Sequence, residues 1–187
     1  MGKIEFIVNE EIGTVIISPF VANDERGRLI KYYSAKEFSQ IGIVFNPVEE
    51  AFLESKRGVL RGLHFQETKQ QPKILNCIQG RLFVLILDVN SQRRSFGTWW
   101  TQEIKAYESI FIPGDCALGT LSLTDSVSHI MYGEDFDAEL STGIRWNDPD
   151  LMIGWPLDKV DHVVISEKDK NLPFFSEYKK KCERKQI

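Results

Sequence analysis

The feature that most constrains the fold is a succession of short apolar segments between residues 59 and 132. The segments are rich in Val, Ile, Leu, Phe and Trp, and Gly, Pro, Asn or Asp separates them. Such runs are typical of β-strands, and many short strands without long helical patterns between them favour a sandwich or a barrel. We therefore predict an all-β fold.

The predicted strands can be placed by residue type. They cover residues 12–17, 29–33, 41–48, 51–53, 59–66, 73–78, 81–89, 96–104, 109–113, 117–123 and 128–132. Pro47 places the strands at 41–48 and 51–53 near a sheet edge, and Gln79-Gly80 predicts a tight hairpin turn between the strands on either side. Ser34, followed by Glu37, predicts a short helix, and the tail 176–185 predicts another.

Composition excludes several classes of protein. The chain has 187 residues, of which 42% are hydrophobic and 27% charged, and no composition break divides it, so we expect one domain over residues 1–187. A net charge of −4 with scattered Lys and Arg gives no footprint for nucleic acid. No apolar run approaches the roughly 20 residues that span a bilayer, and the start MGKIEF does not resemble a signal peptide. A cytoplasmic protein with reduced thiols is expected, because its three cysteines lack metal or redox spacing.

The stretch GVLRGLHFQ at residues 58–66 carries the strongest candidate for chemistry. It predicts a strand that presents His64 from a rigid element. Strict alternation would place Arg61 and His64 on opposite faces, whereas a bulge at Gly62 would bring both to one cavity. Residue types alone leave these alternatives open.

Several motifs, in order along the chain, resemble one family. GVLRGLHFQ is similar to the signature strand of the dTDP-4-dehydrorhamnose 3,5-epimerase family, and DERG at 24–27 resembles its early D-x-R-G. GIRWNDP at 143–149, WPL at 155–157 and ISEKD at 165–169 match three later motifs. The resemblance implies a cupin-type jelly roll, a homodimer and a nucleotide-diphosphate sugar as ligand.

The resemblance also implies roles for individual residues. His64 matches the family's catalytic base, Asp169 the carboxylate that orients it, and Lys73 a cation at the keto oxygen. Arg61 matches a phosphate contact, and Arg26 an arginine that reaches the diphosphate in the neighbouring subunit. Substrate contacts are implied for Gln66 and Phe136 as well. No cofactor and no metal are expected: the three histidines form no H-x-H pair, which argues against a metal-dependent cupin.

The chain departs from the family pattern around the ligand. Leu118 stands where a second active-site histidine is typical. The family's catalytic tyrosine corresponds to Met131 or Ile130 by two ways of counting, and to Tyr132 with one insertion. We expect Tyr132 to be the acid.

Two further differences concern the expected base pocket. Glu49 begins a segment that is polar in the family and here continues with Ala51 and Leu53, and Lys31 replaces a carboxylate. Thymidine would match such a pocket poorly, so the nucleotide need not be thymidine.

These observations yield one leading hypothesis and one alternative. A ketone at carbon 4 acidifies the protons at carbons 3 and 5, and epimerisation there needs a base, an acid on the other face and a cation at the enolate oxygen. The leading hypothesis is an epimerase of a nucleotide-linked 4-keto-6-deoxy sugar that acts at carbon 3, carbon 5 or both, with one carbon favoured. The alternative is a binding or scaffold member of the same fold that has lost turnover.

Overall fold

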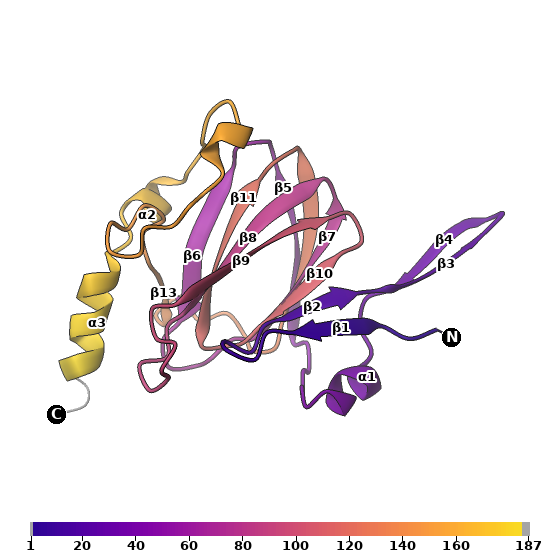
Figure 1. Cartoon of the computed structure of the whole chain (residues 1–187), viewed down its shortest axis with the longest axis horizontal. Helices are drawn as coiled ribbons and strands as arrows, with labels where there is room; N and C mark the ends of the chain where they lie inside the picture. The colour runs from indigo at the N-terminus through magenta and orange to yellow at the C-terminus, as the bar shows by residue number, and fades with distance from the viewer. Residues whose placement is uncertain (1, 185–187) are drawn as a thin grey trace.

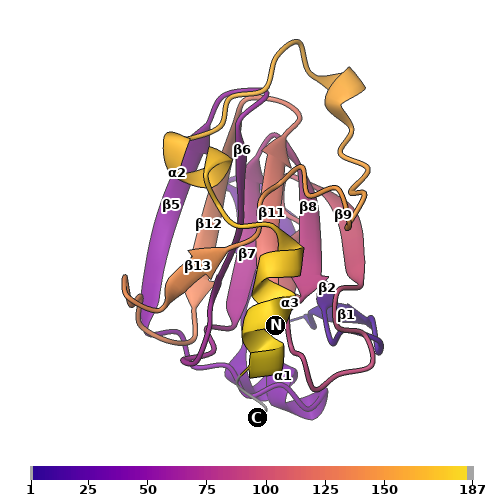
Figure 2. The ribbon, with the colours of Figure 1, turned by 90° about the vertical axis from the view of Figure 1, so that its left-hand side faces the viewer.

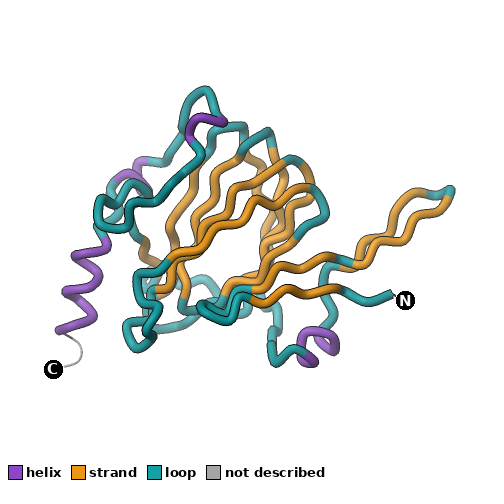
Figure 3. The backbone as a smooth tube through the Cα atoms, in the orientation of Figure 1, coloured by secondary structure: helices purple, strands orange, loops and turns teal. Residues whose placement is uncertain are grey.

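Two antiparallel sheets form the body of the protein in the computed structural model, which describes residues 2–184. Strands make up the body and short helices lie at its periphery (Figure 3). The first sheet has the order β1 (Glu5–Val8), β2 (Val15–Ser18), β10 (Ser109–Ile112), β7 (Lys73–Gln79), β12 (Ser126–Tyr132) and β5 (Glu49–Ser55). The second has the order β13 (Ser141–Gly143), β6 (Leu60–Gln66), β11 (Cys116–Ser122), β8 (Arg81–Asp88) and β9 (Trp99–Lys105). The all-β prediction is confirmed.

Alternation along the strands explains how the layers pack. In β8, Leu82, Val84 and Ile86 enter the core between the two sheets, whereas Leu85 and Leu87 face the opposite side. Both faces of this strand are therefore buried, which accounts for its uninterrupted apolar sequence.

Helices and loops cover the outer faces of both sheets. The helix α3 (Phe175–Arg184) lies over the second sheet, where Tyr178 packs against Phe65 (Figures 1 and 2). The helix α1 (Ala35–Gln40) covers the first sheet with Phe38. Two shorter elements, η1 (Leu157–Lys159) and α2 (Glu167–Lys170), lie in the segment that leads to α3. Among the described residues, no helix is long and apolar enough to cross a membrane.

The strands β3 (Phe20–Asp24) and β4 (Gly27–Lys31) form a separate two-stranded hairpin. It projects from the body as an arm (Figure 1). Leu29 on this arm is 50% exposed.

Two predictions of local structure are wrong. Residues 41–48 form no strand, because Ile43 bonds back to Phe38 and Phe45 is buried in the core beside α1. Gly80 does not close a hairpin: β7 and β8 belong to different sheets, and the chain crosses between them at this residue. The reason is the packing of Gly80 against the turn before β12, where an added Cβ would lie 2.4 Å from the Asp125 carbonyl oxygen. The helices predicted after Ser34 and in the tail are confirmed, although residue 185 lies outside the described residues.

Candidate active site

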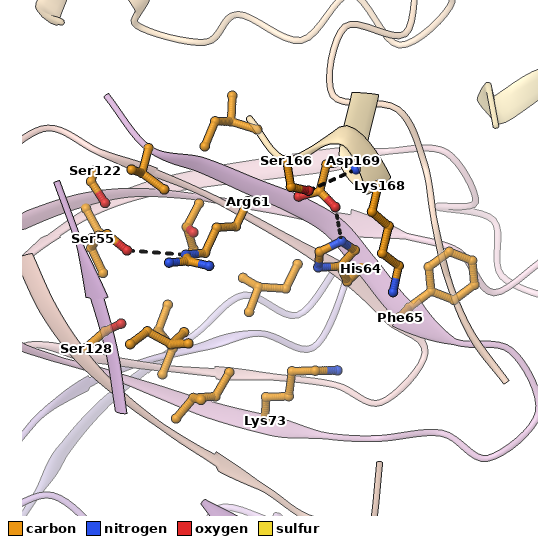
Figure 4. A pocket seen from close by; sticks show the side chains of 18 of the residues that line it. Ser55, Arg61, His64, Phe65, Lys73, Ser122, Ser128, Ser166, Lys168 and Asp169 are labelled. Carbon is orange, nitrogen blue, oxygen red and sulfur yellow. Dashed lines mark hydrogen bonds and ion pairs between the residues drawn. The ribbon is translucent and has the colours of Figure 1, made fainter. Parts of the chain in front are cut away.

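A cavity of about 610 Å³ opens between the two sheets on the side of β5 and β6. Its walls come from β5, β6, β7, β11 and β12, and residues 164–169 contribute on one side. Figure 4 shows His64 beside Asp169 on one wall of this cavity, Arg61 farther along the same strand, and Lys73 on the opposite wall. Strands from both sheets thus present side chains to one space.

A bulge in β6 gives this cavity both of its signature residues. Leu118 of β11 pairs with His64 and Thr120 pairs with Arg61, so β6 carries one residue more than β11 across this stretch. Gly62 lies in the bulge with φ of 97°, and a Cβ there would meet the Leu118 carbonyl oxygen at 2.3 Å. Because of the extra residue, Arg61 and His64 both line the cavity, as the bulge alternative predicted.

His64 and Asp169 form a close pair. The Nε2 atom of His64 lies 2.7 Å from Oδ1 of Asp169, and the Gly62 N–H donates to Oδ2 at 3.1 Å. Ser166 caps α2 by accepting the N–H of Asp169, which places the carboxylate in the first turn of that helix. A neutral His64 that donates from Nε2 keeps its lone pair on Nδ1. The arrangement therefore holds one tautomer of a half-exposed histidine.

The charge of Asp169 follows from its partners. Burial raises the pKa of this carboxyl, but the hydrogen bonds from His64, Gly62 and Ser166 together hold the pKa below its ordinary value. Asp169 thus stays ionised at neutral pH.

Lys73 is a buried cation at the cavity wall. Its side chain is almost fully buried, and Nζ donates to the Gln71 carbonyl oxygen at 2.8 Å. Burial lowers the pKa of this ammonium to about 8. The lysine is consequently still protonated at pH 7 but carries a charge that the fold solvates poorly.

The direction of side chains along β12 separates Met131 from the other two positions considered for the acid. Ile130 and Tyr132 line the cavity, whereas Met131 points into the core under α1. Tyr132 pairs with Lys73 on the neighbouring strand. Burial, and after it the negative charge of Glu49, raises the pKa of the phenol, which keeps its proton at neutral pH.

Two further cations, Arg61 and Lys168, line the cavity. Arg61 donates from Nε to Ser55 Oγ at 3.2 Å and from Nη2 to the Glu54 carbonyl oxygen at 3.4 Å. Lys168, which sequence reasoning did not select, also lines the cavity, and its side chain runs past His64 (Figure 4). Its position directly before Asp169 in the ISEKD motif was the available signal.

Of the other predicted site residues, three line the cavity and three do not. Gln66, Leu118 and Phe136 are part of its wall. Arg26 lies at the tip of the projecting hairpin, where it is paired with Asp24.

Lys31 and Glu49 are also outside the wall. Lys31 pairs with Glu37 at 3.0 Å, and Glu49 accepts the backbone N–H of Phe136 at 3.1 Å. Within residues 2–184, no group of three or more His, Cys, Asp and Glu side chains is arranged to hold a metal ion.

Comparison with known proteins identifies relatives that are all named as nucleotide-sugar epimerases. The chain matches the family model described as dTDP-4-dehydrorhamnose 3,5-epimerase over residues 10–177. It is 36% identical over 174 residues to the enzyme of that name from Methanothermobacter thermautotrophicus, across 91% of this chain and 94% of the relative. A dTDP-4-dehydro-6-deoxyglucose 3-epimerase from a Streptomyces species is 29% identical over 160 residues, across 83% of this chain and 81% of the relative.

Solved structures agree. A dTDP-6-deoxy-D-glucose-3,5-epimerase from Legionella pneumophila, in complex with dTDP-4-keto-L-rhamnose, superposes with a TM-score of 0.87 at 28% identity. The match covers 93% of this chain and 94% of that one. The predicted cupin-type jelly roll is confirmed.

Proposed function

This chain belongs to the dTDP-4-dehydrorhamnose 3,5-epimerase family, and from that premise we propose how its cavity works. It is an isomerase that inverts a carbon next to the ketone of a nucleotide-linked 4-keto-6-deoxy sugar. The observation that carries the proposal is the 2.7 Å pair of His64 and Asp169 inside a cavity that can enclose a sugar.

His64 acts as the base. A proton next to a ketone is acidic enough for an imidazole to remove if the resulting positive charge is stabilised. Asp169 is ionised and hydrogen-bonded to the ring, so it stabilises the imidazolium and fixes the tautomer that leaves Nδ1 free to accept the proton.

Lys73 stabilises the enolate that proton removal creates. An ammonium in a dry wall interacts strongly with a developing oxyanion, because little water screens the two charges. The same burial that lowers the pKa of Lys73 to about 8 thus makes its charge effective.

Tyr132 returns a proton from the other face of the enolate. The first sheet contributes Tyr132 and the second contributes His64, so the two groups can approach a bound sugar from different walls. Leu118 pairs with His64 across the strands and can neither donate nor accept a proton. Leu118 makes this part of the wall apolar, which favours inversion at one carbon. That carbon can be carbon 3 or carbon 5, because both lie next to the ketone.

Arg61 and Lys168 bind the diphosphate, and Phe136 contacts the base. Both cations line the cavity, and guanidinium and ammonium groups pair favourably with phosphate oxygens.

The functional unit is a homodimer in the cytoplasm, with residues 1–187 acting as one domain. The projecting hairpin supports the dimer, because an isolated two-stranded hairpin is at best marginally stable in water. Arg26 at its tip lies outside the cavity of its own chain and would serve that of a partner.

Incubation with 4-keto nucleotide sugars in heavy water tests the reaction. Deuterium uptake, read by NMR, identifies the carbon, and His64→Ala should lower uptake by on the order of 10²-fold or more. Asp169→Asn should lower it strongly, since the tautomer is no longer fixed. Wild-type uptake in His64→Ala would remove this histidine from the mechanism, and no uptake with any sugar would favour the scaffold alternative.

A further inference from the structure

Side chains of the cavity wall hold a short segment at its mouth, residues 134–137. Gln71 donates from Nε2 to the Glu134 carbonyl oxygen at 2.8 Å. Gln66 donates to the Asp135 carbonyl oxygen at 3.3 Å and accepts the Asp137 N–H at 2.6 Å. The segment follows β12 and belongs to no strand, so these side chains take the place of a sheet ladder.

A third side chain completes the set. The carboxylate of Glu49, at the start of β5, accepts the Phe136 N–H at 3.1 Å. Gln66 and Gln71 are each 3% exposed, so their amides are oriented by packing as well as by hydrogen bonds. Together, Gln66, Gln71 and Glu49 bind the backbone of four consecutive residues; we name these three side chains the loop clamp.

The loop clamp holds an aromatic ring in solvent. Phe136 lies between the clamped peptide groups, lines the cavity and is 56% exposed. A phenyl ring in that position contributes little to the core, whereas its flat apolar face suits stacking with another ring.

Both amide hydrogens of Gln66 are already used. Its amide nitrogen donates to the carbonyl oxygens of Lys69 and Asp135, and its amide oxygen accepts from Asp137. No amide hydrogen of Gln66 remains for a ligand, although its position in the signature strand predicted a direct contact.

We propose that Gln66, Gln71 and Glu49 are positioning residues that fix Phe136 as the platform on which the base of the nucleotide stacks. The inference rests on the proposed function, because it assumes a nucleotide ligand. The sequence predicted that Gln66 and Glu49 contact the substrate directly. In this proposal they act on the substrate through Phe136, whose loop they hold in place.

The first test measures the loop clamp without any ligand. Backbone hydrogen exchange in residues 134–140 should accelerate on the order of tenfold or more in Gln66→Met, which removes every hydrogen bond of that side chain. Glu49→Ala should accelerate exchange at Phe136, and Glu49→Gln should restore protection because its amide oxygen still accepts. The controls are Gln102→Met on β9 and Glu50→Ala, whose partner is His129. Unchanged exchange in both Gln66→Met and Glu49→Ala would overturn the proposal.

The second test measures binding by calorimetry with dTDP, UDP and inorganic pyrophosphate. Gln66→Met and Phe136→Ala should each weaken nucleotide binding on the order of tenfold, the usual effect of losing one stacked base, and leave pyrophosphate binding unchanged. In the Phe136→Ala background, Gln66→Met and Glu49→Ala should have no further effect, because the platform is already absent. The catalytic rate at saturating substrate should stay near wild type while KM rises.

Three results would contradict the platform role. Equal weakening of pyrophosphate and nucleotides would assign Gln66 to the phosphates, and additive losses with Phe136→Ala would show that it acts independently. If Gln66→Met accelerates hydrogen exchange in the loop but leaves nucleotide affinity unchanged, the position of the Phe136 ring does not matter for binding. A wild type that binds nucleotides but exchanges no sugar proton would overturn the proposed function alone.

Discussion

Replacing Lys73 with methionine should make the protein more resistant to unfolding near neutral pH and nearly inactive. The pKa of this ammonium falls from its ordinary 10.5 to about 8 in the folded chain. At 1.36 kcal/mol per pH unit, holding the charge in the fold costs about 3 kcal/mol at pH 7. Methionine has a similar shape and no charge, so Lys73→Met removes this cost but leaves the Gln71 carbonyl oxygen unpaired, a loss of about 1–3 kcal/mol.

The pH dependence separates these two contributions. Between pH 8 and 10.5 the unfolded chain keeps the proton on Lys73 and the folded chain does not, so the stability of the wild type rises with pH through this window. The cost is about 3 kcal/mol at pH 7 and about 1 kcal/mol at pH 10. The wild type should therefore gain about 2 kcal/mol relative to Lys73→Met between these pH values.

Urea unfolding of both proteins at pH 7 and pH 10 measures this difference, and groups other than Lys73 titrate alike in the two proteins. Deuterium exchange into the sugar should fall about 10²–10³-fold in the variant, the usual effect of losing one group that stabilises an oxyanion. A stability difference that does not change with pH, or a variant with wild-type exchange, would refute the account of Lys73 as a destabilising buried charge kept for catalysis.

Two further predictions concern the acid and the dimer. Tyr132→Phe should leave wash-out of the substrate proton at least partly intact while inverted product falls, as NMR in heavy water can show; equal loss of both would remove Tyr132 from the role of acid. Light scattering at micromolar concentration should give twice the monomer mass. Arg26→Ala should weaken substrate binding without changing that mass, because the Arg26 side chain is 85% exposed and pairs with Asp24 of its own hairpin. If the wild type is a monomer and Arg26→Ala binds nucleotide sugar as tightly as the wild type, the site is not shared between subunits.

The sequence by itself predicted most strands of the two sheets, and its motifs singled out His64 and Asp169. Alternation and turn residues act over a few positions, so β7 to β12 could be predicted from local patterns. His64 and Asp169 are more than 100 positions apart, and only the resemblance of their motifs joined them; the structure places them 2.7 Å apart.

Tertiary structure decided which side chains share the cavity. Alternation leaves Arg61 and His64 on opposite faces, and the bulge against β11 reverses this because a residue added to one strand changes the face of all that follow. The same sensitivity to register selected Tyr132 and Ile130 over Met131 on β12.

Burial and partner choice also required the fold. Sequence patterns place charged residues on surfaces, yet Lys73 is buried in the cavity wall. Lys168 and Glu49 are exposed, but the first lines the cavity and the second accepts a hydrogen bond from the Phe136 N–H. No local pattern reports the dielectric around an ammonium or the backbone group that faces a carboxylate, because both are set by segments distant in sequence. The sequence supplies these residues, and the tertiary structure sets their burial and their hydrogen-bond partners.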